Sequence, residues 1–138
     1  MQRSTIKTVA LLAIGSELLD GRVVDTNSNY LAKQISELGL ETATVLSCHD
    51  NIDEICRALE FACVRADAVF ITGGLGPTTD DLTREAVAKF CGVDLCTDES
   101  ALEQIQAIFE KRGRKFSPNN AKQADFPRGA SVIPNNTG

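Results

Sequence analysis

Two loops hold most of the side chains in this sequence that could do chemistry. The first covers residues 15–27 and the second covers residues 72–81, and each follows an apolar segment. The second loop places three glycines within four positions, at Gly73, Gly74 and Gly76. Glycine permits positive φ and lets a ligand approach the main chain closely, so the N–H groups of this loop suit a phosphate or pyrophosphate.

The second loop differs from the two common phosphate-binding motifs. It lacks the Lys-Ser/Thr ending of a Walker loop and the GxGxxG spacing of a dinucleotide-binding fingerprint. A lone Gly-Gly pair would most simply form a tight turn between a strand and a helix, but the added Gly-Pro and the Thr-Thr-Asp-Asp tail favour a functional loop. The predicted ligand-binding residues of this loop are Gly73, Gly74, Leu75, Gly76, Pro77 and Thr78.

Asp80 and Asp81 at the end of this loop admit two interpretations. Two carboxylates beside a phosphate-binding loop are what a divalent metal or an activated water requires. The same pair could instead offset the dipole of a helix that starts near Thr79 or Asp80, with Asp80 pairing with Arg84 four residues later. The residue types favour neither interpretation over the other.

The first loop supplies Gly15, Ser16, Glu17 and Asn27 as further predicted ligand-binding residues. Glu17 follows the first predicted strand and Asp50 ends the second, so parallel strands would bring both to the edge that holds the glycine loop. Asp50 and Asn27 could also act only as helix caps. Lys122 is a plausible cation for the ligand, although its simplest interpretation is a solvated surface lysine.

The elements that must position these loops alternate between strands and helices. The segment 6–14 is a nearly continuous apolar run, which is typical of a buried parallel strand. The other predicted strands are 42–48, 68–72 and 130–133, and the predicted helices lie at about 26–38, 52–63, 79–91, 99–112 and 118–124. This order predicts one α/β domain over residues 1–138, with a three-layer parallel sheet, mixed at its edge, and helices on both faces.

Composition and charge narrow the class of function. The formal net charge is −5 and no basic run occurs, so binding to nucleic acid is not expected. No apolar run approaches the roughly 20 residues that span a bilayer, and no secretory signal is evident, so a cytoplasmic protein without a membrane partner is expected. The five cysteines form no CxxC pair, and the helical spacing of Cys56 and Cys63 favours small core residues over a metal or disulfide site.

Four blocks of the sequence together resemble one known family. Residues 15–27 (GSELLDGRVVDTN) resemble the opening of the competence/damage-inducible CinA proteins, and residues 72–83 (TGGLGPTTDDLT) resemble their second signature. Residues 120–124 and 134–138 are similar to two later blocks. The resemblance covers essentially the whole chain and implies the molybdopterin-binding fold of MoaB and MogA.

The resemblance also implies site residues and a reaction. An aspartate after the glycine loop is functionally important in that superfamily and corresponds to Asp80 or Asp81, and a second one corresponds to Asp50. CinA-type domains are associated with metal-dependent hydrolysis of ADP-ribose to AMP and ribose 5-phosphate. The implied catalytic residues are therefore Asp80, Asp81 and Asp50, with Mg²⁺, Mn²⁺ or Co²⁺ held by Asp80, Asp81 and Glu17.

Other expectations follow from the resemblance. The alternatives to hydrolysis are a non-catalytic module that binds a pterin or nucleotide, and molybdopterin adenylyl transfer. A homo-oligomer is expected, and an amidase domain is expected on a separate or missing segment. Many family members carry Asp where this chain has Ser16, and the family usually continues past Gly138, so a C-terminal truncation is expected.

Overall fold

Strand β1 (Thr8–Ile14) lies at the centre of the computed structural model, which describes residues 5–135. Every residue from Val9 to Ile14 is at most 2% exposed. A strand buried on both faces needs cover on both faces, and the near-continuous apolar sequence of β1 matches that position. The first predicted strand is thereby confirmed.

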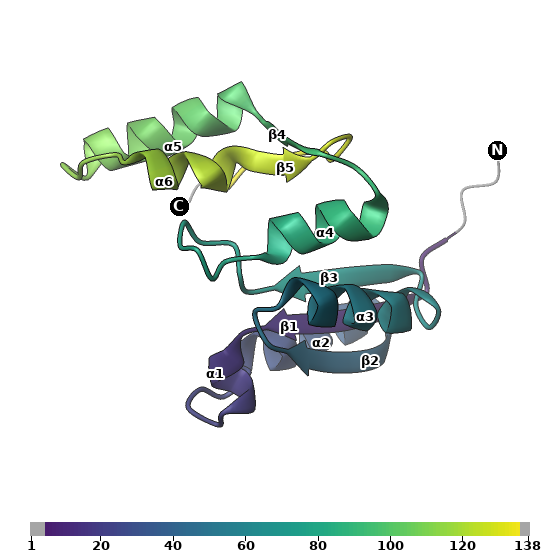
Figure 1. Cartoon of the computed structure of the whole chain (residues 1–138). Coiled ribbons are helices and arrows are strands. Elements are labelled where there is room, and N and C mark those ends of the chain that lie inside the picture. The colour runs from purple at the N-terminus through teal and green to yellow at the C-terminus, as the bar shows by residue number, and fades with distance from the viewer. Residues whose placement is uncertain (1–4, 136–138) are drawn as a thin grey trace.

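The two neighbours of β1 are β2 (Glu41–Cys48) and β3 (Ala68–Thr72), in the order β2-β1-β3, and both pairings are parallel. Helix α2 (Thr26–Glu37) connects β1 to β2, and α3 (Ile52–Cys63) leads from β2 across to β3. The two connections run in opposite directions along the sheet. Right-handed crossovers therefore place α2 and α3 on opposite faces, which gives the predicted three layers (Figure 1).

Two apolar clusters hold the layers together, because successive side chains of β1 point to opposite faces. On one face, Val9 and Leu11 pack against Ile35 of α2. On the other face, Leu12 packs with Ile55 of α3, in a cluster that also includes Ala86 of α4 (Thr83–Cys91). The helix pair α3 and α4 thus covers the face opposite α2.

The C-terminal part of the chain forms a separate layer beyond α4 (Figure 1). It consists of β4 (Leu95–Thr97), α5 (Glu99–Lys111), α6 (Pro118–Ala121), the 3-10 turn η1 (Lys122–Ala124) and β5 (Asp125–Pro127). Strands β4 and β5 pair antiparallel in a two-stranded sheet of their own. The antiparallel pair therefore does not sit at the edge of the three-stranded sheet.

The predicted strand at 130–133 is wrong. The last strand within residues 5–135 is β5, which ends at Pro127, and residues 130–133 have no regular structure. Gly129 adopts φ 89° and the N–H of Ala130 donates to the carbonyl of Pro127, so a turn ends the strand. The apolar side chain of Ile133 consequently stays 86% exposed.

The predicted start of the fourth helix at Thr79 or Asp80 is also wrong, because α4 begins at Thr83. The residues before it form a turn in which the N–H of Asp81 donates to the carbonyl of Thr78, at 3.3 Å. The sequence interpretation also missed the short helix α1 (Ser16–Leu19). No helix within residues 5–135 is long and apolar enough to cross a membrane.

The cysteines are all free thiols. Cys56 packs against the core of α3 and α4 as predicted, but Cys63 is exposed, which corrects its assignment to the core. Cys63 is the last residue of α3.

Candidate functional site

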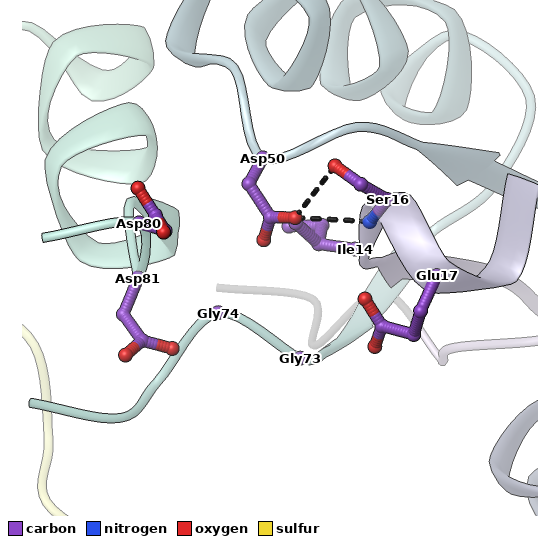
Figure 2. A pocket seen from close by; sticks show the side chains of 8 residues that line it. All are labelled: Ile14, Ser16, Glu17, Asp50, Gly73, Gly74, Asp80 and Asp81. Carbon is purple, nitrogen blue, oxygen red and sulfur yellow. Dashed lines mark hydrogen bonds between the residues drawn. The ribbon is translucent and has the colours of Figure 1, made fainter. Parts of the chain in front are cut away.

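A pocket of about 460 Å³ lies at the carboxyl ends of the three parallel strands. Its lining residues come from the end of β1, the end of β2 and the loop between β3 and α4, and they are Ile14, Ser16, Glu17, Asp50, Gly73, Gly74, Asp80 and Asp81 (Figure 2). All of these except Ile14 were predicted site residues. Ile14 is the last residue of a buried strand, and nothing in its residue type distinguishes it from the rest of the core.

The Gly73-Gly74 turn brings the glycine loop against the end of β1. Gly73 and Gly74 adopt φ values of 89° and 61°, which L side chains rarely take. A Cβ on Gly73 would also collide with the carbonyl oxygen of Ile14, and one on Gly74 would collide with Oγ1 of Thr83. That hydroxyl donates to the carbonyl of Gly73 at 2.8 Å, so the first residue of α4 closes the turn.

Asp50 connects the end of β2 to the start of α1. Its Oδ2 accepts hydrogen bonds from the N–H of Ser16 at 2.9 Å and from the Ser16 hydroxyl at 3.0 Å. The cap of α3 is Asn51, whose side chain accepts from the N–H groups of Asp53 and Glu54. Asp50 is therefore free of the capping role, and its second carboxylate oxygen lies on the pocket side (Figure 2).

Asp81 is held inside the loop. Its Oδ2 accepts from the N–H of Thr78 at 2.8 Å and from the Thr78 hydroxyl at 2.6 Å. Burial alone raises the pKa of Asp81, but the hydrogen bonds from Thr78 and from the N–H of Gly76, with the charge of Arg84, outweigh it, so the net pKa lies below the ordinary value. Asp81 is consequently a carboxylate at neutral pH.

Asp80 is exposed and makes no hydrogen bond or ion pair within residues 5–135. The predicted pair with Arg84 does not form, because the Arg84 guanidinium is buried and donates to the carbonyls of Leu75 and Gly76 instead. The alternative in which both aspartates offset a helix dipole is also wrong, since α4 starts after them. Asp80 is thus an exposed carboxylate in the lining of the pocket.

Four carboxylates line the pocket, and no lysine or arginine among residues 5–135 lines it. Within the described residues, no three Asp, Glu, His or Cys side chains lie close enough together to hold a metal ion. The predicted set of Asp80, Asp81 and Glu17 therefore does not form a protein-only cage. Mg²⁺ usually keeps several waters and binds one or two carboxylates together with substrate phosphates, and these residues fit that looser arrangement.

Some predicted ligand-binding residues lie outside the lining of this pocket. The N–H of Gly15 donates a hydrogen bond to the carbonyl of Cys48 at 3.1 Å. Asn27 is exposed on α2, and the N-cap of that helix is Asp25. Leu75 lines a second cavity, of about 810 Å³, on the other side of the loop. The remaining loop residues that do not line the pocket are Gly76, Pro77 and Thr78. Their predicted ligand contacts stay predictions.

Lys122 binds main-chain carbonyls of the glycine loop and lies outside the lining of the pocket. Its Nζ forms an ion pair with Glu85 at 2.9 Å and donates to the carbonyls of Asp81 at 2.7 Å and Thr78 at 3.2 Å. The lysine is therefore not a solvated surface residue. A pattern of sequence letters could not reveal this, because Lys122 is more than 40 residues away from the loop it contacts.

Cys48 adds no nucleophile to the site. Burial, reinforced by the charges of Glu54 and Asp50, raises the pKa of this thiol to about 11. The reactive form of cysteine is the thiolate, so Cys48 is a protonated core side chain at neutral pH.

The chain resembles known proteins over most of its length. Residues 10–135 match the family described as "Probable molybdopterin binding domain". A CinA-like protein of Anaeromyxobacter dehalogenans is 48% identical over 130 residues, which are 94% of this chain and 32% of that protein. A CinA-like protein of Syntrophus aciditrophicus is 44% identical over 94% of this chain and 31% of its own length. The chain thus spans about a third of the length of the curated relatives it matches.

Solved structures show the same fold. The crystal structure of CinA from Thermoplasma acidophilum, a protein described as having unknown function, is 35% identical with a TM-score of 0.86, over 96% of this chain and 77% of that one. MoaB from Thermus thermophilus gives a TM-score of 0.58 at 20% identity, over 74% of this chain and 64% of that one. At such an identity the likeness to MoaB shows the fold alone.

Proposed function

The chain belongs to the molybdopterin-binding domain family as a CinA-like member, and from this we propose that its pocket carries out metal-dependent hydrolysis of a nucleotide pyrophosphate. The substrate in this proposal is ADP-ribose, and the products are AMP and ribose 5-phosphate. The family itself supports a small pterin or nucleotide as the ligand.

The observation that carries the proposal is the meeting of four carboxylates with a glycine turn in one pocket. A bare pyrophosphate would be repelled by Glu17, Asp50 and the loop aspartates. A divalent metal that arrives with the pyrophosphate would supply the missing positive charge, held by Asp80 and Glu17. The carboxylates then help to bind the metal, and the repulsion between them and the pyrophosphate explains why the reaction depends on that metal.

The other residues have separate tasks in this proposal. The main chain at Gly73 and Gly74 lets a phosphate approach closely, because neither residue has a Cβ. Asp50, oriented by its two hydrogen bonds from Ser16, takes the proton of the attacking water. The water oxygen bonds to one phosphorus atom, and the bond between that phosphorus and the bridging oxygen breaks. One phosphate group remains on AMP and the other remains on ribose 5-phosphate.

The test is chromatographic detection of AMP from ADP-ribose, with and without Mg²⁺, Mn²⁺ or Co²⁺. We expect metal-dependent release of AMP, and a rate about 10²–10⁴-fold lower for Asp50→Asn because the proton acceptor is lost. Asp80→Asn should raise the metal concentration needed for half-maximal rate.

The matched control is Asp53→Asn, because Asp53 is an exposed aspartate on α3 that pairs with Lys89 outside the pocket. It should leave the rate unchanged. Turnover in Asp50→Asn and Asp80→Asn equal to that of Asp53→Asn would contradict the assigned roles.

A second candidate is a binding module without chemistry. The four carboxylates also match a ligand rich in N–H donors, such as a pterin, whose amino and ring N–H groups can donate to a carboxylate in pairs. Saturable binding of a pterin, with no product from ADP-ribose under any metal, would favour this candidate. Molybdopterin adenylyl transfer, the homo-oligomer and the amidase domain remain predictions.

A further inference from the structure

Arg84 is an unusual buried cation. It lies in the first turn of α4, is 6% exposed, and forms no ion pair with a carboxylate within residues 5–135. Its Nε is buried and has no hydrogen-bond partner in the same part of the chain. Burying a charge without an opposite charge is costly, so this position calls for a compensating role.

The guanidinium of Arg84 donates hydrogen bonds to two successive carbonyls of the glycine loop. Nη1 donates to Leu75 O at 2.6 Å and Nη2 donates to Gly76 O at 2.7 Å. These are short, charge-assisted hydrogen bonds, and the planar fork of arginine suits two acceptors at a fixed separation. A lysine ammonium is a point charge and does not offer this geometry.

The peptide between Leu75 and Gly76 is held at both ends. Its carbonyl accepts from Arg84, and its N–H donates to the carboxylate of Asp81. A Cβ on Gly76 would lie only 2.6 Å from Asp81 Oδ2, so the carboxylate packs directly against this peptide. Arg84 therefore acts on Asp81 through one peptide unit, although the two side chains form no ion pair.

Lys122 completes the same arrangement from η1 by binding the carbonyls of Thr78 and Asp81. Four carbonyl oxygens of the loop thus accept from two buried or half-buried cations, neither of which lines the pocket. The main chain of the loop is therefore bound at four points by cations that lie outside the lining of the pocket.

We infer that Arg84 is a positioning residue of the glycine loop, which fixes the loop conformation and the place of Asp81 by binding the Leu75 and Gly76 carbonyls. This role goes beyond the proposed reaction, but its effect on affinity rests on the proposed function, because it assumes that the loop binds a pyrophosphate. The effect on the loop itself does not depend on the ligand.

The experiment compares Arg84→Ala and Arg84→Lys with the unaltered chain and with Arg57→Ala, a control arginine that is exposed on α3. The first readout is amide hydrogen exchange across residues 73–83 without ligand. The second is the dissociation constant of the α,β-methylene analogue of ADP with Mg²⁺, which is not hydrolysed. In both Arg84 variants we expect faster exchange in the loop and a dissociation constant raised about tenfold or more.

Chemical rescue separates positioning from general damage. Arg84 also lines the second cavity, of about 810 Å³, so a small cation has a route to the vacated position. Methylguanidinium at millimolar concentration should restore slow exchange and affinity in Arg84→Ala, and methylammonium at the same concentration should not. A variant damaged elsewhere would respond to neither compound.

The outcomes are distinct. Loop exchange in both Arg84 variants equal to that of Arg57→Ala would overturn the inference. Equal rescue by methylguanidinium and methylammonium would also overturn it, because charge alone would then suffice. Faster loop exchange in the variants, with no analogue binding by any protein including the unaltered chain, would uphold the role of Arg84 and reject the proposed function. If Arg84→Ala does not fold, the exchange of Arg84→Lys decides.

Discussion

The two adjacent aspartates of the pocket lie in different surroundings. Asp81 is bound by the backbone and hydroxyl of Thr78, whereas Asp80 is exposed and makes no hydrogen bond within residues 5–135. One carboxylate therefore shapes the loop and the other is available to a ligand. Two neighbouring aspartates can therefore have different roles in one site, because their roles depend on their hydrogen-bond partners as well as on residue type.

At the residue scale, the stabilising effect of Asp81 should depend on pH. Its pKa is lowered in the folded chain, so ionised Asp81 stabilises the fold fully above the unfolded pKa, near 4, and this contribution is lost as pH falls through the folded value. We expect Asp81→Asn to lower the free energy of unfolding more at pH 7 than at pH 3. Urea unfolding at several pH values measures the difference.

The control for this prediction is Glu60→Gln, because Glu60 is an exposed carboxylate on α3. Subtracting the change in unfolding free energy caused by Glu60→Gln removes the effect of losing one negative charge from the chain. A destabilisation by Asp81→Asn that is the same at both pH values would refute the role of the ionised carboxylate.

At the scale of elements, α3 is joined to the site through its cap. Asn51 accepts hydrogen bonds from the N–H groups of Asp53 and Glu54, and the preceding Asp50 is bound to Ser16 at the start of α1. The start of α3 therefore sets where β2 ends and where the Asp50 carboxylate is placed.

Replacing this cap should affect both stability and the site. Asn51→Ala is expected to lower the free energy of unfolding by about 1 kcal/mol, because the first N–H groups of α3 lose their acceptor. A smaller loss of ligand affinity should follow from the altered position of Asp50. Thermal unfolding and ligand titration measure the two effects.

Asn27→Ala is the matched control, because Asn27 is exposed in the first turn of α2, where Asp25 already provides the cap. Its stability should change little. A loss of affinity in Asn27→Ala alone would show that the predicted ligand contact of Asn27 exists, and an unchanged stability of Asn51→Ala would contradict the capping argument.

At the scale of the whole molecule, β1 carries both cores. Leu11 and Leu12 are each 1% exposed, yet they face opposite sides of the sheet, toward α2 and toward α3. The pocket lies at the end of this strand, so the same packing that stabilises the fold also holds the Gly73-Gly74 turn against Ile14.

Truncation on either face of β1 should therefore be costly. Leu11→Ala and Leu12→Ala are each expected to lower the free energy of unfolding by about 2–5 kcal/mol, because each leaves a cavity in a closed core. Val64→Ala, at a side chain that is 79% exposed, should cost less than about 0.5 kcal/mol. Chemical denaturation measures all three, and a cost for Leu11→Ala as small as that for Val64→Ala would contradict the two-sided core.

The sequence by itself determined the order β1, α2, β2, α3, β3 and the edge of the sheet that holds the site, but it missed α1 and the short strands β4 and β5. The apolar run of β1, the helical spacing in α2 and α3, and the glycines after β3 are local patterns that directly reflect burial and backbone conformation. Parallel strands then bring Glu17, Asp50 and the loop aspartates together, because their ends meet at one edge.

Only the tertiary structure decided which partner each polar side chain takes. Arg84 is four residues from Asp80, a spacing that favours an ion pair in a helix, but α4 starts too late for that pair and the guanidinium binds the loop carbonyls instead. Lys122 reaches the same loop from the C-terminal layer. Packing brings together polar groups that are distant in sequence, and these groups compete for the same hydrogen-bond partners. Local sequence spacing therefore does not predict which partner each side chain binds.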